Sequence, residues 1–131
     1  MERSAHNPWS WQDQFGFSQG IQVKGVERVL VCAGQTSTDG DGNPHHPGDM
    51  RAQIAMALDN LEAVLRDADM DLSNIIRLNY YTTDVDAFLM GGDVLGARFA
   101  ASGNRPASTL LGVSRLAFPD LLIEIEATAV A

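Results

Sequence analysis

The stretch DMRAQIAMALDNLEAVLRDAD, residues 49–69, carries the strongest local signal in this chain of 131 residues. Its apolar side chains recur at spacings of three and four residues, at Ile54, Leu58, Leu61, Leu65 and Ala68. Charged side chains occupy the opposite side of the same helical wheel, at Arg51, Asp59, Glu62 and Arg66. Apolar residues at this spacing form one stripe along a helix. The stretch therefore predicts an amphipathic helix that packs on one side.

The last segment, LLIEIEATA at residues 121–129, alternates between apolar and polar residues. In a strand, Ile123, Ile125 and Ala127 point one way, and Glu124, Glu126 and Thr128 point the other way. Further strands are predicted over residues 15–23, 28–33, 74–83 and 107–114, the first two forming a hairpin around the turn at residues 24–25. A capping box at residues 83–86 begins a second helix that extends to about Ala101.

The predicted order is ββαβαββ, an α+β domain with two helices on one face of a mixed sheet. Its length fits one domain over residues 1–131. We expect the second face to combine the carboxylates Glu124 and Glu126 with apolar residues, among them Leu110, Leu122 and Val130. A half-apolar open face is often covered by another subunit, which predicts a homo-oligomer.

Composition narrows the function classes. Nine Lys and Arg against 17 Asp and Glu give a net charge of −8, with no basic cluster, which disfavours nucleic acid as a partner. No run reaches the ~18 apolar residues of a membrane span, so no membrane partner is expected. The single cysteine, Cys32, cannot form an intrachain disulfide, and it is expected to be a small buried hydrophobe. These features fit a cytoplasmic protein.

Few residues suggest a cofactor or a metal. The acidic stretch at residues 39–43 resembles a calcium loop, but Pro44 and Met50 stand where that loop needs Gly and Glu. His45 and His46 are adjacent and have no further ligand at a suitable spacing, which favours a solvated loop. Trp9 and Trp11 are expected to cover the core or an interface. No metal and no cofactor are predicted.

Glu124 and Glu126 are the best acid/base candidates, because they lie two residues apart on one strand face. A solvated surface pair is the plain alternative. Apolar surroundings between subunits would raise the pKa of a carboxyl group and make it a usable proton carrier.

Several short motifs together resemble one family. They are FGFSQG at 15–20, AGQ at 33–35, ALDNL at 57–61, YTTD at 81–84, RPAST at 105–109 and IEIEA at 123–127. In this order the chain resembles the Rid family, also called the YjgF family of reactive intermediate deaminases. The resemblance implies a chorismate-mutase-like fold, a homotrimer with a central barrel of sheets, and clefts between subunits. It also implies hydrolysis of 2-imino acids and their enamine tautomers to 2-keto acids and ammonia.

This chain departs from the family pattern where the substrate carboxylate is held. Ser108 stands at the position of the family's arginine. The family's cleft tyrosine corresponds to Phe17, the serine before Gly-Gln to Ala33, the helix asparagine to Gly92 and the cysteine to Leu110. The water-orienting glutamate is retained as Glu124. Backbone N–H groups of Gly34 and Leu110 remain as possible donors.

Three functions follow from these departures. In the first, a Rid-like trimer binds or hydrolyses a small, neutral or less acidic metabolite, with Glu124 as the water-orienting carboxyl. In the second, the protein is an imine or enamine deaminase, and Arg105 or Arg98 supplies the missing charge. Arg105 is expected to point to the strand face opposite Ser108. In the third, the trimer binds a ligand without catalysis. Some family members carry endoribonuclease or translation-inhibitor names, which the charge of −8 disfavours here.

Overall fold

A computed structural model describes all residues, 1–131. The long helix α1 spans Met50–Asp67, as predicted, and the side chain of Asp49 caps it by accepting a hydrogen bond from the Ala52 N–H at 3.0 Å. Ile54, Leu58, Leu61 and Leu65 of its apolar stripe are fully buried, whereas Ala68, the last predicted member, lies just beyond the helix and is half-buried. A cap and a continuous apolar stripe explain why this helix was predictable from local sequence.

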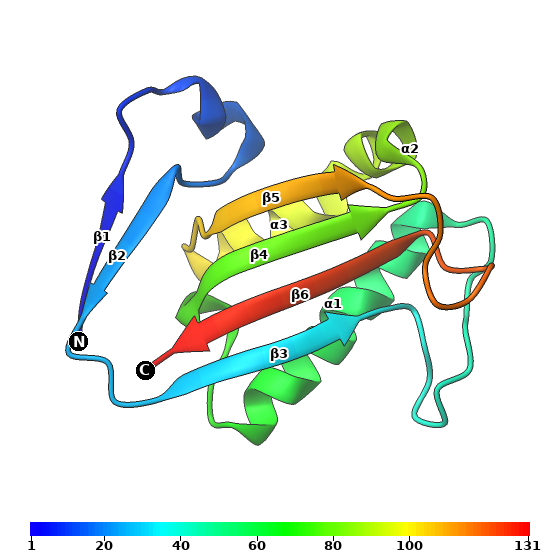
Figure 1. The fold of residues 1–131 in the computed structure, drawn as a ribbon, viewed down its shortest axis with the longest axis horizontal. Helices are drawn as coiled ribbons and strands as arrows, with labels where there is room; N and C mark the ends of the chain where they lie inside the picture. Colours follow the sequence, from blue (N-terminus) through cyan, green and yellow to red (C-terminus); the bar gives the residue numbers. More distant parts are fainter.

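The main sheet has four strands in the order β3-β6-β4-β5 (Figure 1). These are β3 (Val29–Gln35), β6 (Ile123–Val130), β4 (Ile75–Thr82) and β5 (Ala107–Gly112). β6 lies between β3 and β4 and is antiparallel to both, whereas β4 and β5 are parallel. The sheet is therefore mixed, as predicted.

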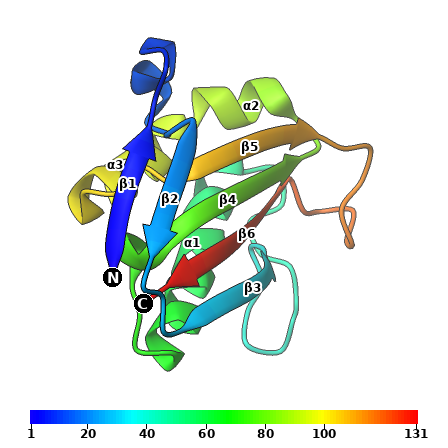
Figure 2. The same cartoon turned by 60° about the vertical axis from the view of Figure 1, so that its left-hand side comes forward.

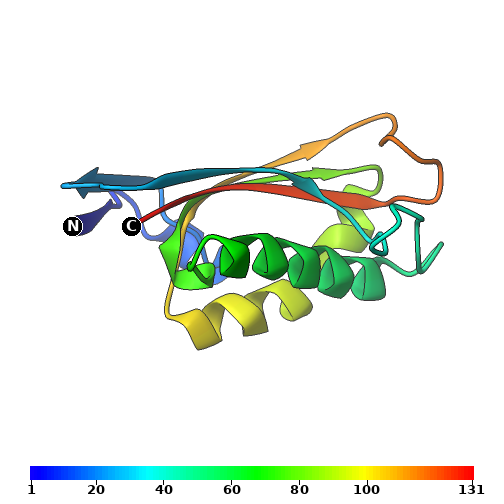
Figure 3. The same cartoon turned by 90° about the horizontal axis from the view of Figure 1, so that it is seen from below.

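The helices cover one face of this sheet and leave the other face open (Figure 3). The core between the layers is formed by Ile54, Leu58, Leu61, Leu65, Ile75, Leu78, Ile123 and Ile125, all buried. Alternation along β6 is as predicted, since Ile123 and Ile125 are inaccessible while Glu124 and Glu126 retain partial exposure. Glu124 and Glu126 therefore lie on the open face.

The predicted N-terminal hairpin is wrong. β2 (Gly20–Lys24) does not pair with β3 but with β1 (Glu2–His6), in a separate two-stranded sheet beside the main one (Figures 1 and 2). Arg3 holds this sheet in place, because its guanidinium donates to the carbonyl oxygens of Ser73 and Ile75 and to Asn104 Oδ1. These partners are 70 to 101 residues away, so no local pattern reveals them.

The single second helix predicted up to Ala101 is in fact two helices, α2 (Val85–Met90) and α3 (Gly92–Ser102). They break at Gly91, where an added Cβ would lie 3.2 Å from Ile54 Cδ1 of α1. The helices approach so closely there that a side chain would crowd α1. The cap of α2 is also one residue later than predicted, because Asp84 accepts from the Ala87 N–H.

Two 3-10 helices complete the fold: η1 (Trp11–Phe15) and η2 (Leu72–Asn74). η1 lies between β1 and β2, and the chain that follows it reaches the edge of the main sheet. There the Ser18 N–H donates to the Pro106 carbonyl at 3.2 Å, and the Ser18 hydroxyl donates to the Arg105 carbonyl at 2.6 Å. The segment around η1 is thereby fixed beside β5.

Candidate functional site

A cavity of about 870 Å³ opens between β5, α3 and the segment around η1. β4 and α2 also contribute to its apolar lining, which includes Leu78, Tyr80, Phe88, Leu95, Phe99 and Leu110. Concave and largely apolar cavities of this size are the usual place for a small-molecule ligand. This cavity is the first half of the candidate site.

Four of the predicted binding residues line this cavity: Phe17, Gly92, Ser108 and Leu110. The structure corrects the predicted position of Leu110, which was expected on the open face. Ser108 pairs with Leu78 and Leu110 pairs with Tyr80 in the parallel register of β4 and β5. Because paired residues of neighbouring strands point to the same face, Ser108 and Leu110 face the helices.

Ser108 and Tyr80 both line the cavity. Tyr80 is 7% exposed, and burial raises the pKa of its phenol far above the ordinary value, an effect that a hydrogen bond with Ser108 opposes. The Ser108 hydroxyl also donates to the Pro106 carbonyl at 3.1 Å. A neutral hydroxyl pair thus stands where the family resemblance places a guanidinium. Nothing in the local sequence indicated the role of Tyr80, because a tyrosine in a strand is usually core.

Charged side chains lie around the cavity, and each has a partner. Arg105 contacts Asp13 at 3.2 Å, and both side chains are more than half exposed. Asp93 is paired with Arg51 of α1. Arg105 lines the same cavity as Ser108, contrary to the prediction that it points to the opposite face, because β5 begins only at Ala107. The alternation of a strand does not extend back to Arg105.

Arg98, the other predicted substitute for the missing arginine, does not line this cavity. Its guanidinium contacts Asp59 at 2.6 Å and Glu62 at 2.9 Å, both on α1. Two carboxylates already neutralise it. Arg98 therefore ties α3 to α1 and is unsuited to hold a substrate carboxylate.

The second half of the candidate site surrounds Glu124 on the open face. Gly34 lies directly beneath its carboxyl group, so closely that a Cβ at Gly34 would stand 2.0 Å from Glu124 Oε1. Ala33 and Gly34 fall within an irregularity of β3, between the pairs Cys32–Ala127 and Gln35–Ile125. Glycine is required here by close approach of a side chain and not by the backbone angle.

The environment of Glu124 favours a protonated carboxyl group. Burial raises its pKa, and repulsion from Glu126 raises it further. Glu126 itself is held by Asn79, whose amide donates to Oε1 at 2.9 Å, and by Tyr81, whose hydroxyl donates to the same oxygen at 2.6 Å. Glu126 is thus fixed as an acceptor, while Glu124 makes no such bond and remains available to a ligand or water.

Within one chain the two halves are separated by the sheet. Glu124 and Gly34 lie on the open face, whereas Ser108, Leu110 and Gly92 lie on the helix side. The predicted residues therefore form two groups and not one. The sequence alone gives no sign of this division, because the face to which each side chain points depends on the register between β4, β5 and β6.

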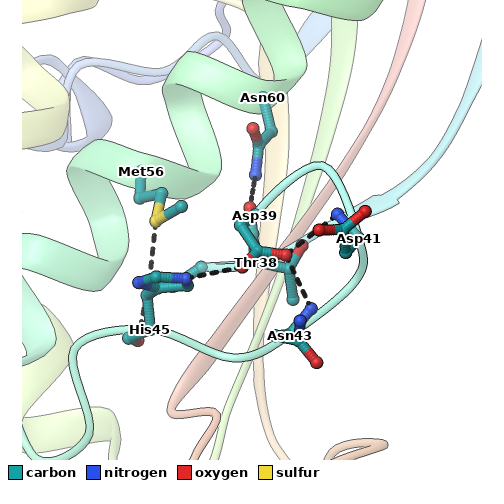
Figure 4. A network of polar contacts seen from close by, with 8 residues as sticks. Thr38, Asp39, Asp41, Asn43, His45, Met56 and Asn60 are labelled. Atoms are coloured by element: carbon teal, nitrogen blue, oxygen red, sulfur yellow. Dashed lines mark hydrogen bonds and ion pairs between the residues drawn. The ribbon is translucent and has the colours of Figure 1, made fainter.

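The irregular loop between β3 and α1 is organised by Asp39 (Figure 4). Asp39 contacts His45 Nε2 at 2.9 Å and accepts from the Asn43 N–H, and these bonds lower its pKa to about 2. Asn60 of α1 donates to two carbonyl groups of the same loop. The His45 and His46 rings are 6.1 Å apart, and the structure contains no group of three or more residues placed to hold a metal.

Two further predictions concern single residues. Cys32 is buried, as expected, and burial raises the pKa of its thiol. Trp9 and Trp11 do not cover the core of this chain, since both are more than half exposed. Trp11 packs edge-to-face on Phe17 at a ring distance of 5.7 Å, beside the cavity. None of the helices is long and apolar enough to cross a membrane.

Comparison with known proteins gives consistent matches over most of the chain. A model of the endoribonuclease L-PSP family matches residues 12–131. A RutC family protein of Pyrococcus abyssi is 31% identical over 113 residues, which cover 86% of this chain and 84% of the relative. The 2-iminobutanoate/2-iminopropanoate deaminase of Escherichia coli K12 is 30% identical over 117 residues, covering 85% and 88%.

Solved structures agree with the sequence matches. The Rid family protein YyfB of Yersinia pestis has a TM-score of 0.88 and 32% identity, with both chains covered completely. The YjgF protein of Escherichia coli has a TM-score of 0.70 and 28% identity over 87% of each chain. On the matched residues, the fold and these likenesses, the chain belongs to the Rid (YjgF) family, whose family model is described as endoribonuclease L-PSP.

Proposed function

We propose that this protein is a homotrimer that binds, and hydrolyses at a carbon–nitrogen bond, a small uncharged metabolite in clefts between its subunits. Each cleft combines the cavity beside β5 of one copy with Glu124 and Gly34 of the next copy. Two observations support the proposal: partial burial raises the pKa of the Glu124 carboxyl, and every charged side chain that lines the cavity has a partner of opposite charge.

Assembly is supported by the open face of the sheet. Val29, Val31 and Leu111 are each more than half exposed there, on the two edge strands, and they flank the polar centre at Glu124 and Glu126. Exposed apolar groups around a polar centre are typical of a surface that meets another subunit. A second copy is also needed for chemistry, since the sheet of one chain separates Ser108 from Glu124.

The preference for an uncharged ligand follows from electrostatics. An arginine that grips a carboxylate provides charge-assisted hydrogen bonds of about 1.5–3 kcal/mol each, and Ser108 provides none. Glu124 in its ionised form would also repel a substrate carboxylate. Arg105 is engaged by Asp13 and Arg98 by two carboxylates, so neither replaces the guanidinium freely.

In the proposed reaction Glu124 orients a water molecule and takes its proton as the water oxygen attacks the carbon of a C=N group. That proton passes to nitrogen, which gives a carbinolamine. Transfer of the remaining hydroxyl proton to nitrogen, again through Glu124, then forms the C=O bond as the carbon–nitrogen bond breaks, and a carbonyl compound and ammonia leave. A raised pKa makes the Glu124 carboxylate a stronger base toward this proton than an ordinary glutamate. No cofactor is needed for this hydrolysis.

Deamination of 2-imino acids is the second candidate, because two relatives, from rat and from Escherichia coli, carry that activity in their names. It requires a carboxylate grip that this chain provides only through Arg105 or backbone N–H groups such as those of Gly34 and Leu110. The third candidate is a protein that binds a ligand without catalysis. It differs from the two catalytic candidates in that its function would not need Glu124.

Three measurements test these functions. Light scattering is expected to give three times the 14.1 kDa protomer mass, and a monomer would refute the shared cleft. A 2-imino acid generated in situ by an amino acid oxidase, trapped as its semicarbazone, is expected to decay at the uncatalysed rate. Fast decay would establish the deaminase instead. The Ser108→Arg variant is expected to gain about tenfold in pyruvate binding, with Ser108→Leu as the control.

A further inference from the structure

The polar side chains of β4 on the open face direct their hydrogen bonds to only one of the two glutamates. In the antiparallel register of β4 and β6, Tyr81 lies directly opposite Glu124, and Asn79 lies directly opposite Glu126. The Tyr81 hydroxyl nevertheless donates to Glu126 Oε1 at 2.6 Å, and the Asn79 amide donates to the same oxygen at 2.9 Å. Tyr81 thus reaches its diagonal neighbour, which aromatic side chains can do across a sheet. Glu124 receives neither hydrogen bond.

This arrangement separates the two carboxyl groups by what holds them. Two donors on one oxygen fix the position of the Glu126 carboxyl. The Tyr81 phenol keeps its proton and remains a donor, because its hydrogen bond to Glu126 raises its pKa. Glu124 lies two residues away on the same face of the strand, with no donor from β4 on its carboxyl group. Glu126 is therefore suited to stay in place, and Glu124 to exchange a proton.

Few charged or titratable groups share this face with Glu124. β6 supplies Glu126, and β4 supplies the Tyr81 phenol and the Arg77 guanidinium, which lies farther along the strand, opposite Thr128. β3 and β5 carry no charged residue, and the Cys32 thiol of β3 is buried in the core. Glu126 is thus the one other carboxylate that the four strands contain. Burial is the larger cause of the raised pKa of Glu124, and repulsion from Glu126 adds to it.

We infer that Glu126 is a positioning residue for Glu124. Tyr81 and Asn79 fix its carboxylate as a second negative charge on the same strand face, and this charge makes Glu124 a stronger base toward a bound water molecule. The directions of the hydrogen bonds fit this role, since a donor on the Glu124 carboxylate would favour its ionised form and weaken it as a base. The inference rests on the proposed function, because it concerns the reaction at Glu124.

The test measures proton binding by Glu124 itself in the full-length protein. The side-chain carboxyl carbon of Glu124 is followed by NMR against pH, and its resonance is identified by its loss in Glu124→Gln. The wild type is compared with Glu126→Gln, which removes the charge and keeps the shape of the side chain. Unit charges ~7 Å apart, the spacing of alternate residues in a strand, change proton binding about threefold in water. Glu124 is therefore expected to bind its proton about threefold more weakly in Glu126→Gln.

Two further variants make this result specific. Asp67→Asn is the matched control, because it also removes one negative charge, from an exposed residue at the end of α1. It is expected to change proton binding by Glu124 less than about 1.5-fold, since solvent and salt screen a distant surface charge. Glu126→Thr removes the charge with a strand-favouring residue and replaces Glu126→Gln if that variant does not fold. Unchanged proton binding in a folded neutral variant of Glu126, or an equal change in Asp67→Asn, would overturn the inference.

A spectroscopic signature tests the hydrogen bond from Tyr81. The chain has two tyrosines, and Tyr80 is buried, so the phenolate absorbance that develops on raising the pH reports Tyr81 first. The Tyr81 phenol is expected to ionise at a lower pH in Glu126→Gln than in the wild type, and Tyr81→Phe is expected to lack this step. Ionisation at the same pH in both proteins would show that Tyr81 does not hold Glu126, which would also overturn the inference.

The inference and the proposed function fail in different ways. If Glu126→Gln weakens proton binding by Glu124 but no hydrolysis depends on Glu124, the coupling between the two carboxyl groups stands and the proposed function fails. If hydrolysis requires Glu124 but its proton binding does not depend on Glu126, the inference fails and the proposed function stands.

Discussion

Replacing Gly34 with alanine tests the contact on which Glu124 depends. The added Cβ would stand 2.0 Å from Glu124 Oε1, 2.6 Å from Cδ and 2.8 Å from Cγ, whereas ordinary contacts begin at 3.4 Å. The carboxyl oxygen must therefore move by at least 1.4 Å, the difference between 3.4 and 2.0 Å. Overpacking of this kind costs about 1–3 kcal/mol. The lower entropy of unfolded alanine offsets about 0.4–1 kcal/mol of that cost.

A double-mutant cycle separates these two effects. In the Glu124→Ala background the contact is gone, so Gly34→Ala is expected to stabilise the protein by about 0.4–1 kcal/mol instead of destabilising it. Urea unfolding of all four proteins at one protomer concentration measures the cycle. Gly20→Ala, whose Cβ would meet its nearest atom at 3.7 Å, is the control. An equal loss of stability from Gly34→Ala in both backgrounds would show that Glu124 does not lie over Gly34.

Three further perturbations have defined outcomes. Because burial raises the Glu124 pKa in the folded state, wild-type stability falls as pH rises above the ordinary value of 4.5; Glu124→Gln removes this loss. The urea midpoint of Glu124→Gln should therefore rise relative to that of the wild type between pH 4 and pH 8. A difference between the two midpoints that does not change with pH would contradict the raised pKa of Glu124. Arg3→Ala removes three long-range hydrogen bonds, should cost about 2–3 kcal/mol, and should speed amide exchange in β1 and β2. Unchanged exchange there would mean that Arg3 is not the anchor. Gln53→Leu leaves the carbonyls of His46 and Asp120 and the Leu122 N–H without their buried partner and should cost about 3 kcal/mol on urea unfolding, more than an exposed Gln22→Leu control.

Local patterns predicted the parts of the fold that are determined locally. α1 has its own cap and an unbroken apolar stripe, and β6 alternates from Ile123 to Ala129, so neither depends on distant residues for its recognition. The partner of β2 could not be predicted, because β1 is polar and is held in place by Arg3 across the fold. The break at Gly91 was equally hidden, since its cause is a contact with α1.

The residues of the candidate site could be predicted from the sequence, but their positions relative to one another could not. Family motifs identified Glu124 and Ser108, yet the facing of each is set by strand register, and register placed them on opposite sides of the sheet. The partnership of Ser108 with Tyr80 and of Arg105 with Asp13 was likewise missed, because each joins residues that are far apart in the chain. The missing arginine alone did not show which charges the cavity contains, and the partners of Ser108 and Arg105 were needed for that.

Glycines in the two halves of the site have different surroundings, which the sequence alone does not distinguish. Gly34 has a close neighbour, since any side chain there would displace Glu124, whereas a Cβ at Gly92 or Gly96 would meet no atom within 4 Å, and Gly96 is exposed. Gly34 therefore lets the Glu124 carboxyl lie against β3, whereas Gly92 and Gly96 restrict no neighbouring side chain. Substitution should therefore affect them oppositely: Gly34→Ala is expected to disturb an existing contact, and Gly96→Ala to stabilise the helix by about 1 kcal/mol. The sign of the stability change on alanine substitution, measured by urea unfolding, thus distinguishes the glycine that lies against a neighbouring side chain from the glycine that faces solvent.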